Sequence, residues 1–361
     1  MQTVTVNLGP RSYSIHIGQD TLASLGELLR ESGLGGKCAV VTNPTVAPLY
    51  LDPVSHSLER SGFAVVPILI PDGEEYKNIN SLSVVYDRLI AERFERKSSI
   101  LALGGGVVGD LAGFAAATFL RGVPYVQVPT TLLAQVDSSI GGKTAINHQQ
   151  GKNLIGAFYQ PRLVVIDVTV LRSLPRRELV AGMAEVIKYG VISDAVLFES
   201  LEREVANVLA LEPTLLIRII SACCSIKARV VEQDEREDDS RAVLNFGHTV
   251  GHALEAVTGY TRFLHGEAVG IGMACATAIS TRRGFCDASS AARIRRLIQK
   301  AGLPLEIPAD VRLPDLIGAI EIDKKSAAGK IKFVMCEGIG KTRFHMLSPE
   351  EIMADLASGS K

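Results

Sequence analysis

This 361-residue sequence lacks the features of several broad classes of protein. No apolar run approaches the ~18 residues that a membrane-spanning helix needs, and the first residues alternate like a strand, unlike a cationic signal peptide. The formal net charge is only −1, so no basic surface indicates a nucleic acid or an anionic membrane as a partner. We therefore expect a cytoplasmic protein with a large core that acts on a small molecule.

Cysteine is sparse, and its spacing indicates no shared role. The six cysteines include no C-x-x-C pair, so neither a disulfide framework nor a zinc–thiolate site is favoured. They are Cys38, Cys223, Cys224, Cys275, Cys286 and Cys336. We expect all of them to be buried free thiols.

Histidine is also scarce, but its distribution is uneven. Of seven histidines, His248, His252 and His265 fall in one short segment, each beside a glycine. Two histidines four residues apart share one face of a helix, and a catalytic zinc site uses about three protein ligands. Thr249 stands where H-E-x-x-H has its glutamate, which excludes a zincin peptidase. The segment predicts a metal site that needs a carboxylate from elsewhere; the alternative is structural histidines at a helix-packing surface.

The pattern of apolar residues predicts two domains, 1–174 and 175–361. A β-hairpin over residues 4–17 precedes apolar strands that alternate with helical segments, which is typical of an α/β domain with a mostly parallel sheet. The expected strands are 39–42, 64–70, 100–103, 125–128 and 163–166. The second domain is expected to be mainly α-helical, with helices at 178–189, 213–231 and 267–282 and one late hairpin at 330–346.

The first domain carries a glycine-rich turn that favours a dinucleotide. Residues 104–109 match G-x-G-x-x-G between an apolar strand and an alanine-rich helix, where a helix amino terminus can stabilise a pyrophosphate. No acidic residue follows ~20 positions later, so the ordinary Rossmann fingerprint is incomplete. The polar loop 72–77 is the alternative place for ribose recognition. The hydroxyls of Thr130 and Thr131 suit either a ligand or a helix N-cap, and a tight turn without any ligand stays possible.

Polar residues between the domains favour an anionic substrate. Lys143, Lys152 and Asn153 stand on glycine-rich segments that we expect to be loops, and such side chains bind phosphate or carboxylate oxygens. Gly142, Lys143 and Thr144 match the end of a P-loop, but the glycine that the P-loop pattern requires upstream of them is missing, which excludes nucleotide triphosphate hydrolysis. Farther on, Glu185 and Lys188 share one face of an apolar helix, so Glu185 is either the missing metal ligand or part of an intrahelical salt bridge.

Together these motifs identify a resemblance to the 3-dehydroquinate synthase family over nearly the whole chain. The segments that carry it are 71–77, 104–110, 128–143, 182–188 and 244–252. The resemblance implies Zn²⁺ or Co²⁺ bound by Glu185, His248 and His265, with His252 in the active site but not on the metal. It assigns NAD to Asp72, Gly73, Glu74, Glu75, Tyr76, Lys77, Gly106, Val107, Val108, Gly109, Asp110, Thr130, Thr131, Lys143, Lys152, Val170, Leu171, Arg172 and Ser173. It assigns substrate contacts to Asp137, Lys143, Asn153, Lys188, Lys227, Arg241, Asn245, His252 and Lys324.

The resemblance also implies a reaction and an assembly. Members of the family are lyases that convert 3-deoxy-D-arabino-heptulosonate 7-phosphate to 3-dehydroquinate in the shikimate pathway. A transient NAD-dependent oxidation precedes phosphate elimination, re-reduction and an aldol closure. Arg121 matches an arginine that reaches the phosphate site of the neighbouring subunit, which implies a homodimer. The alternatives are another sugar-phosphate cyclase, a metal-dependent polyol dehydrogenase, or a regulator that binds nucleotide and zinc without catalysis.

Overall fold

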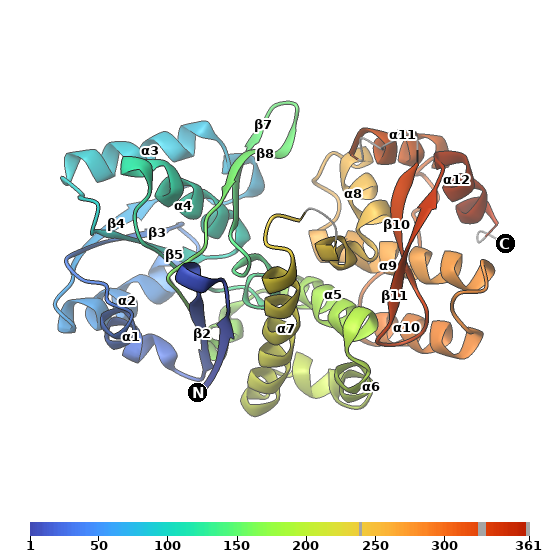
Figure 1. Cartoon of the computed structure of the whole chain (residues 1–361), viewed down its shortest axis with the longest axis horizontal. Helices are drawn as coiled ribbons and strands as arrows, with labels where there is room; N and C mark the ends of the chain where they lie inside the picture. Colours follow the sequence, from blue (N-terminus) through green and yellow to red (C-terminus); the bar gives the residue numbers. More distant parts are fainter. Residues whose placement is uncertain (238–239, 324–329, 359–361) are drawn as a thin grey trace. The chain divides into compact units, whose positions relative to one another are not determined.

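A mostly parallel sheet organises the first half of the chain (Figure 1). The computed structural model describes residues 1–237, 240–323 and 330–358, and within these ranges seven strands pair in the order β1-β2-β9-β6-β5-β3-β4. β1 and β2 form the predicted antiparallel hairpin, and every other pair is parallel. The strands are β1 (Gln2–Val6), β2 (Tyr13–Gly18), β3 (Lys37–Thr42), β4 (Ala64–Leu69), β5 (Ser99–Gly104), β6 (Tyr125–Pro129) and β9 (Leu163–Asp167). The predicted α/β class is confirmed.

Helices cover both faces of this sheet because successive strand residues point to opposite sides. Ile100 and Ala102 pack in one core with α3 (Ile79–Ala91) and α4 (Gly106–Thr118). Their neighbours Leu101 and Leu103 pack in a second core with α1 (Leu25–Glu31) and α2 (Ala47–Arg60). The parallel strands therefore end at a common edge, where the loops that follow them are brought together.

Two features of this half differ from the sequence analysis. The expectation of loops around Lys143, Lys152 and Asn153 is wrong, because these residues lie on an antiparallel hairpin, β7 (Lys143–His148) and β8 (Gly151–Phe158). β8 is mostly exposed and so lacks the alternation that would have predicted a strand. In addition, α7 (Pro213–Gln233) packs against β1 and β2, whereas we expected it in the helical domain.

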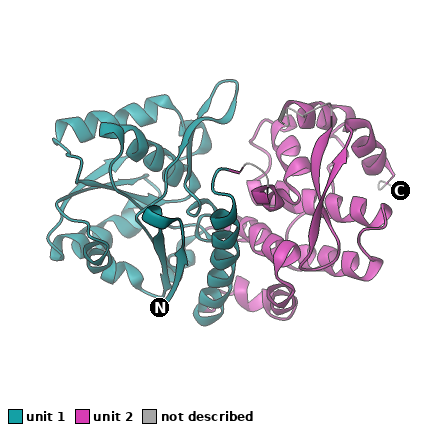
Figure 2. Ribbon diagram, in the orientation of Figure 1, with its two compact units in different colours: residues 1–174, 213–236 teal, residues 175–212, 237–361 magenta. Residues whose placement is uncertain are grey.

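The chain divides into two compact units (Figure 2). Unit 1 contains Met1–Leu174 and Pro213–Arg236, and unit 2 contains Pro175–Glu212 and Glu237–Lys361. The chain leaves unit 1 after Leu174 and returns to it for α7. Within the described ranges no helix is both long and apolar enough to cross a membrane.

Unit 2 is built around α9 (His265–Arg282). This helix contacts α5 (Arg176–Ser193), α8 (His248–Val257), α10 (Ala288–Lys300), α12 (Pro349–Ala357) and β10 (Ile331–Cys336). The remaining elements are α6 (Ala195–Leu209), α11 (Leu313–Asp323) and β11 (Thr342–Leu347), which pairs with β10 as the predicted late hairpin. Unit 2 is thus mainly helical, as expected.

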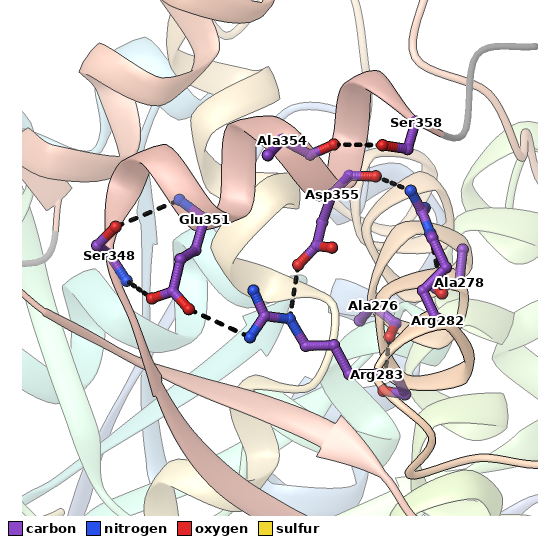
Figure 3. Close-up of polar contacts among 10 residues, drawn as sticks. Ala276, Ala278, Arg282, Arg283, Ser348, Glu351, Ala354, Asp355 and Ser358 are labelled. Carbon is purple, nitrogen blue, oxygen red and sulfur yellow. Dashed lines mark hydrogen bonds and ion pairs between the residues drawn. The ribbon is translucent and has the colours of Figure 1, made fainter.

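Two arginines at the end of α9 anchor the last helix (Figure 3). Arg283 Nε donates to Asp355 Oδ2 at 2.7 Å and its Nη1 lies 3.3 Å from Glu351 Oε1, while Arg282 donates to the backbone carbonyl of Asp355. Glu351 also closes a capping box with Ser348 at the start of α12. α9 therefore carries His265 at its first residue and is anchored to α12 at its other end.

Candidate active site

Three helices of unit 2 bring together the residues predicted to bind metal. Glu185 lies on α5, His248 is the first residue of α8, and His265 is the first residue of α9. Glu185 Oε1 lies 3.4 Å from His248 Nε2 and 3.9 Å from His265 Nε2. In a tetrahedral zinc site, ligand atoms ~2.05 Å from the metal are about 3.3 Å apart. The distances from Glu185 Oε1 to the two Nε2 atoms are therefore close to what a zinc ion requires.

Each of the two histidines is oriented through its other ring nitrogen. His248 Nδ1 lies 3.2 Å from the carbonyl oxygen of Phe246, and His265 Nδ1 lies 3.2 Å from Glu255 Oε2. Metal-binding histidines commonly donate their second N–H to a carbonyl or a carboxylate, which fixes the tautomer. Both Nε2 atoms are thereby directed toward Glu185.

Glycines permit this convergence by allowing backbones to touch. A Cβ on Gly266 would lie 1.8 Å from the carbonyl oxygen of Ala181, and a Cβ on Gly272 would lie 1.9 Å from that of Gly247. The first contact brings α9 against α5, and the second brings it against the turn that begins α8. The glycine beside His265 is thus part of the site's construction.

The carboxylate of Glu185 fits a bound cation. It is fully buried, and neither of its oxygens has a hydrogen-bond partner of good geometry among the residues that the structure describes. Lys188, one turn farther along α5, forms a close ion pair with it, so the salt bridge that the sequence allowed is present as well. A buried carboxylate without hydrogen bonds is costly, and a divalent cation would supply the missing partner.

Burial keeps His248 in the form that binds a metal. Its pKa lies well below the ordinary value, first because of desolvation and then because of the charge of Lys188 and the nearby histidines. The imidazole is therefore neutral near pH 7, which is the protonation state of a ligand.

His252 offers a second possible ligand set. One nitrogen atom from each of His248, His252 and His265 can be chosen so that all three atoms lie within 4.8 Å of one another. These are the three histidines from which the sequence predicted a metal site. The ring centroids of His248 and His252 are 5.2 Å apart. Glu185 Oε1 approaches Nε2 of both His248 and His265, and its oxygens have no hydrogen-bond partner of good geometry in the described part of the chain, so we favour the set that includes it.

In unit 1, the predicted dinucleotide residues gather at the edge where the strands end. α4 begins at Gly106 directly after β5, and Gly105 at its N-cap has no side chain to occupy the first-turn N–H groups. Such a helix terminus can bind a pyrophosphate. A Cβ on Gly109 would lie 2.8 Å from Gln127 Oε1, so this glycine sets how closely α4 packs on β6.

The loop 72–77 is held by side-chain hydrogen bonds. Asp72 accepts from Asn43 Nδ2 at 2.8 Å and from Thr45 Oγ1 at 2.5 Å. Lys77 is buried, and its Nζ lies 2.5 Å from both Asp110 Oδ2 and Asn153 Oδ1. Burial raises the pKa of Asp110 against the opposing effect of Lys77. Lys77, itself a predicted NAD residue, therefore joins one other predicted NAD residue, Asp110, to one predicted substrate residue, Asn153.

Two further segments predicted to bind the nucleotide are linked through Gln135, which the sequence analysis missed. This fully buried side chain lies on the π-helix η5 (Ala134–Ser138) and donates to the carbonyls of Pro129 and Asp167, at 3.2 and 3.0 Å. Those carbonyls end β6 and β9, just before Thr130 and the 3₁₀-helix η6 (Val168–Ser173). Thr131 Oγ1 accepts from Ala134 N at 3.1 Å, so the N-cap alternative holds for this hydroxyl.

The predicted substrate residues fall into both units. In unit 1, Lys227 Nζ lies 2.7 Å from the carbonyl and 2.8 Å from the Oδ1 of Asp137, which links α7 to η5. In unit 2, Lys188 and Arg241 are buried, and Arg241 and Asn245 lie on η7 (Ser240–Asn245), directly before α8. Lys324 lies outside the described residues.

Comparison with known proteins places the chain in a family. Residues 67–181 match 3-dehydroquinate synthase N-terminal, and residues 182–326 match 3-dehydroquinate synthase C-terminal. A 3-dehydroquinate synthase from Pelobacter propionicus is 55% identical over 353 residues, 98% of each chain. The chain belongs to the 3-dehydroquinate synthase family. The resemblance inferred from the motifs is confirmed.

Solved structures of related cyclases share the fold. A 2-deoxy-scyllo-inosose synthase complexed with carbaglucose-6-phosphate, NAD⁺ and Co²⁺ is 26% identical, with a TM-score of 0.90 over 99% of this chain and 100% of that one. ValA, a 2-epi-5-epi-valiolone synthase from Streptomyces hygroscopicus with NAD⁺ and Zn²⁺ bound, is 27% identical, with a TM-score of 0.88 over 96% of each chain. These 3-dehydroquinate synthase relatives therefore share one fold but differ in the cyclic product that they make.

The sequence analysis missed two residues, Glu255 and Gln135, which contact residues or segments predicted to be functional. Glu255 contacts His265 on the next helix, and Gln135 contacts the carbonyls that end β6 and β9. Glu255 had one available signal, since it is an acidic residue at a buried position of an apolar helix, seven residues after His248.

Proposed function

We propose that this chain converts 3-deoxy-D-arabino-heptulosonate 7-phosphate to 3-dehydroquinate and phosphate, with NAD and Zn²⁺ or Co²⁺ as cofactors. The 55% identity to a 3-dehydroquinate synthase carries this proposal, because it extends over 98% of both chains. The cyclases that make other products are only 26 and 27% identical. The reaction is a lyase step of the shikimate pathway. The predicted cytoplasmic location agrees with six cysteines that are all free thiols.

The residues of both units have separate roles in this proposal. Bound NAD supplies a reversible hydride acceptor, and the cation supplies a Lewis acid. Glu185, His248 and His265 hold the cation. The first turn of α4 and the loop 72–77 bind the dinucleotide, with the segments that Gln135 joins. Water exclusion around the buried carboxylate of Glu185 would strengthen its contact with the cation.

The substrate is an anion, and buried cations are suited to bind it. Lys188 and Arg241 present ammonium and guanidinium groups at positions that are at most 1% exposed. In unit 1, Lys227, held by Asp137, supplies another ammonium. Groups of this kind bind the oxygens of a carboxylate or a leaving phosphate. His252 is proposed to exchange a proton through an imidazole nitrogen.

Phosphate release tests the proposal and separates it from its rivals. With the heptulosonate phosphate, catalytic NAD and Zn²⁺ or Co²⁺, we expect many phosphates released per NAD and no net rise in absorbance at 340 nm. Accumulation of NADH with turnover would instead identify a polyol dehydrogenase. Turnover of a hexose 6-phosphate in place of the heptulosonate would identify another cyclase, and binding of NAD and metal without turnover of either would identify a regulator.

We also propose a homodimer in which Arg121 completes the partner's phosphate site. Arg121 lies on η4 (Phe119–Arg121) with a φ of 66°, next to Leu120 with a φ of 48°, and both side chains are exposed. Left-handed backbone at two successive non-glycine residues is strained, and such strain is concentrated at functional sites.

Arg121→Ala should raise KM for the phosphorylated substrate about 10- to 100-fold, because it removes a charge-assisted contact to phosphate. Arg93→Ala is the matched control, since Arg93 is also an exposed arginine with a positive φ of 53°. Mixing Arg121→Ala with Glu185→Gln should recover about a quarter of wild-type activity, because half of the dimers then hold one complete site. An unchanged KM, or no recovery on mixing, would refute the shared site.

A further inference from the structure

Glu255 is a buried carboxylate that faces a proposed metal ligand. It lies near the end of α8 and is 6% exposed, and its Oε2 lies 3.2 Å from Nδ1 of His265. The other nitrogen of the same ring, Nε2, lies 3.9 Å from Glu185 Oε1. The imidazole of His265 therefore bridges two carboxylates, of which only Glu185 belongs to the proposed ligand set.

The backbone of Glu255 also holds the connection between α8 and α9. Its carbonyl accepts from Tyr260 N at 2.8 Å, where the chain turns with a positive φ of 59°. At the other end of the connection, Glu267 Oε2 accepts from Leu264 N at 2.9 Å and both Glu267 oxygens accept from Arg177. The backbone at His265 is thus fixed from both sides, and the Glu255 side chain determines how the ring is turned.

We propose that Glu255 is a positioning residue that accepts the Nδ1–H of His265 and so directs Nε2 to the divalent cation. This inference rests on the ligand set proposed above. A carboxylate in this position fixes the tautomer and makes the ligating nitrogen more basic, and its loss commonly weakens metal binding 10- to 100-fold. His248 has a backbone carbonyl in the same role, so Glu255 is the member of this pair that a substitution can change.

Glu255 also affects the charge available to the substrate. Glu185 and Glu255 carry two negative charges, which balance the two positive charges of the cation. The ammonium of Lys188, paired with Glu185 in the structure, would then be free to bind a substrate anion once the cation is present. A neutral residue at position 255 would remove one negative charge from beside the metal, which disfavours the cation.

Glu255→Gln tests the proposal by cation affinity instead of activity. Gln keeps the size and an acceptor oxygen but removes the charge. We expect the Zn²⁺ and Co²⁺ dissociation constants, measured by chelator competition on the metal-free protein, to rise about 10- to 100-fold. Excess cation should restore most of kcat, which would not happen if the substitution merely disrupted folding. Glu321→Gln, at an exposed position on α11, is the control and should bind both cations like the wild type.

The outcomes separate this inference from the proposed function. A dissociation constant within twofold of wild type for Glu255→Gln overturns the positioning role, even if the protein is an active synthase. If wild type itself binds no stoichiometric cation, the proposed ligand set fails first. Should Glu255→Gln not fold, Glu255→Asp retains the charge on a shorter arm and is expected to weaken binding as well; unchanged affinity there overturns the proposal.

Discussion

Glu185→Gln should leave the protein without its stoichiometric cation and lower kcat/KM about a thousandfold or more. The substitution removes the anionic oxygen that lies 3.4 and 3.9 Å from the two histidine Nε2 atoms. A Lewis acid contributes several kcal/mol to a reaction of this kind, and each 1.4 kcal/mol corresponds to about tenfold in rate. Metal content by elemental analysis and phosphate release measure the two effects.

A matched control separates metal loss from general damage. Glu199→Gln makes the same change at an exposed position on α6 of unit 2, and it should retain both metal and activity. Glu185→Gln also leaves the buried Lys188 without its ion pair, so some loss of stability is expected. Full metal content in Glu185→Gln would refute its role as a ligand and favour the set of three histidines.

Gly266→Ala should destabilise unit 2 and disrupt the metal site together. The added Cβ would overlap the backbone carbonyl oxygen of Ala181 at 1.8 Å, and a backbone atom cannot rotate away as a side chain can. We expect a loss of about 3 kcal/mol as α9 is displaced from α5. The melting temperature should fall by roughly 5–10 °C, and metal affinity should fall because His265 moves away from Glu185.

Gly318→Ala provides the control for this substitution. Gly318 lies inside α11, and a Cβ there would meet no atom within 4 Å. Alanine should therefore be neutral or stabilise by about 0.5–1 kcal/mol through helix propensity. Thermal denaturation with and without chelator compares the two variants. Equal stability of both would show that α9 and α5 do not depend on their close backbone contact.

The parallel sheet could be predicted because its strands are buried on both faces. Strands β5, β6 and β9 are short apolar runs bounded by turns, a pattern that is read directly from sequence. The hairpin β7–β8 could not be found in this way, since β8 is largely exposed and rich in glycine and polar residues. The position of α7 was equally hidden, because an amphipathic helix does not specify which surface its apolar face will cover.

The site was predictable where residue type and chemistry coincide. Histidine spacing singled out the segment proposed to bind metal. The family motifs added Glu185, which helical periodicity left open between ligand and salt bridge. The structure contains both the ion pair of Glu185 with Lys188 and the close approach of Glu185 to His248. The contact between Asn153 and Lys77 was not predictable: Asn153 was expected at the substrate, and its bond to Lys77 depends on a strand pairing that the sequence did not reveal.

The two ends of α9 have a practical consequence for anyone who shortens or labels this protein. An 18-residue helix is about 27 Å long, and this one carries His265 at its first residue and Arg282 at its last. A chain cut before Ser348 would lose the acidic partners of Arg283, so a helix that carries a proposed metal ligand would lose its distal anchor. Affinity tags are therefore better attached beyond α12 than used to replace it.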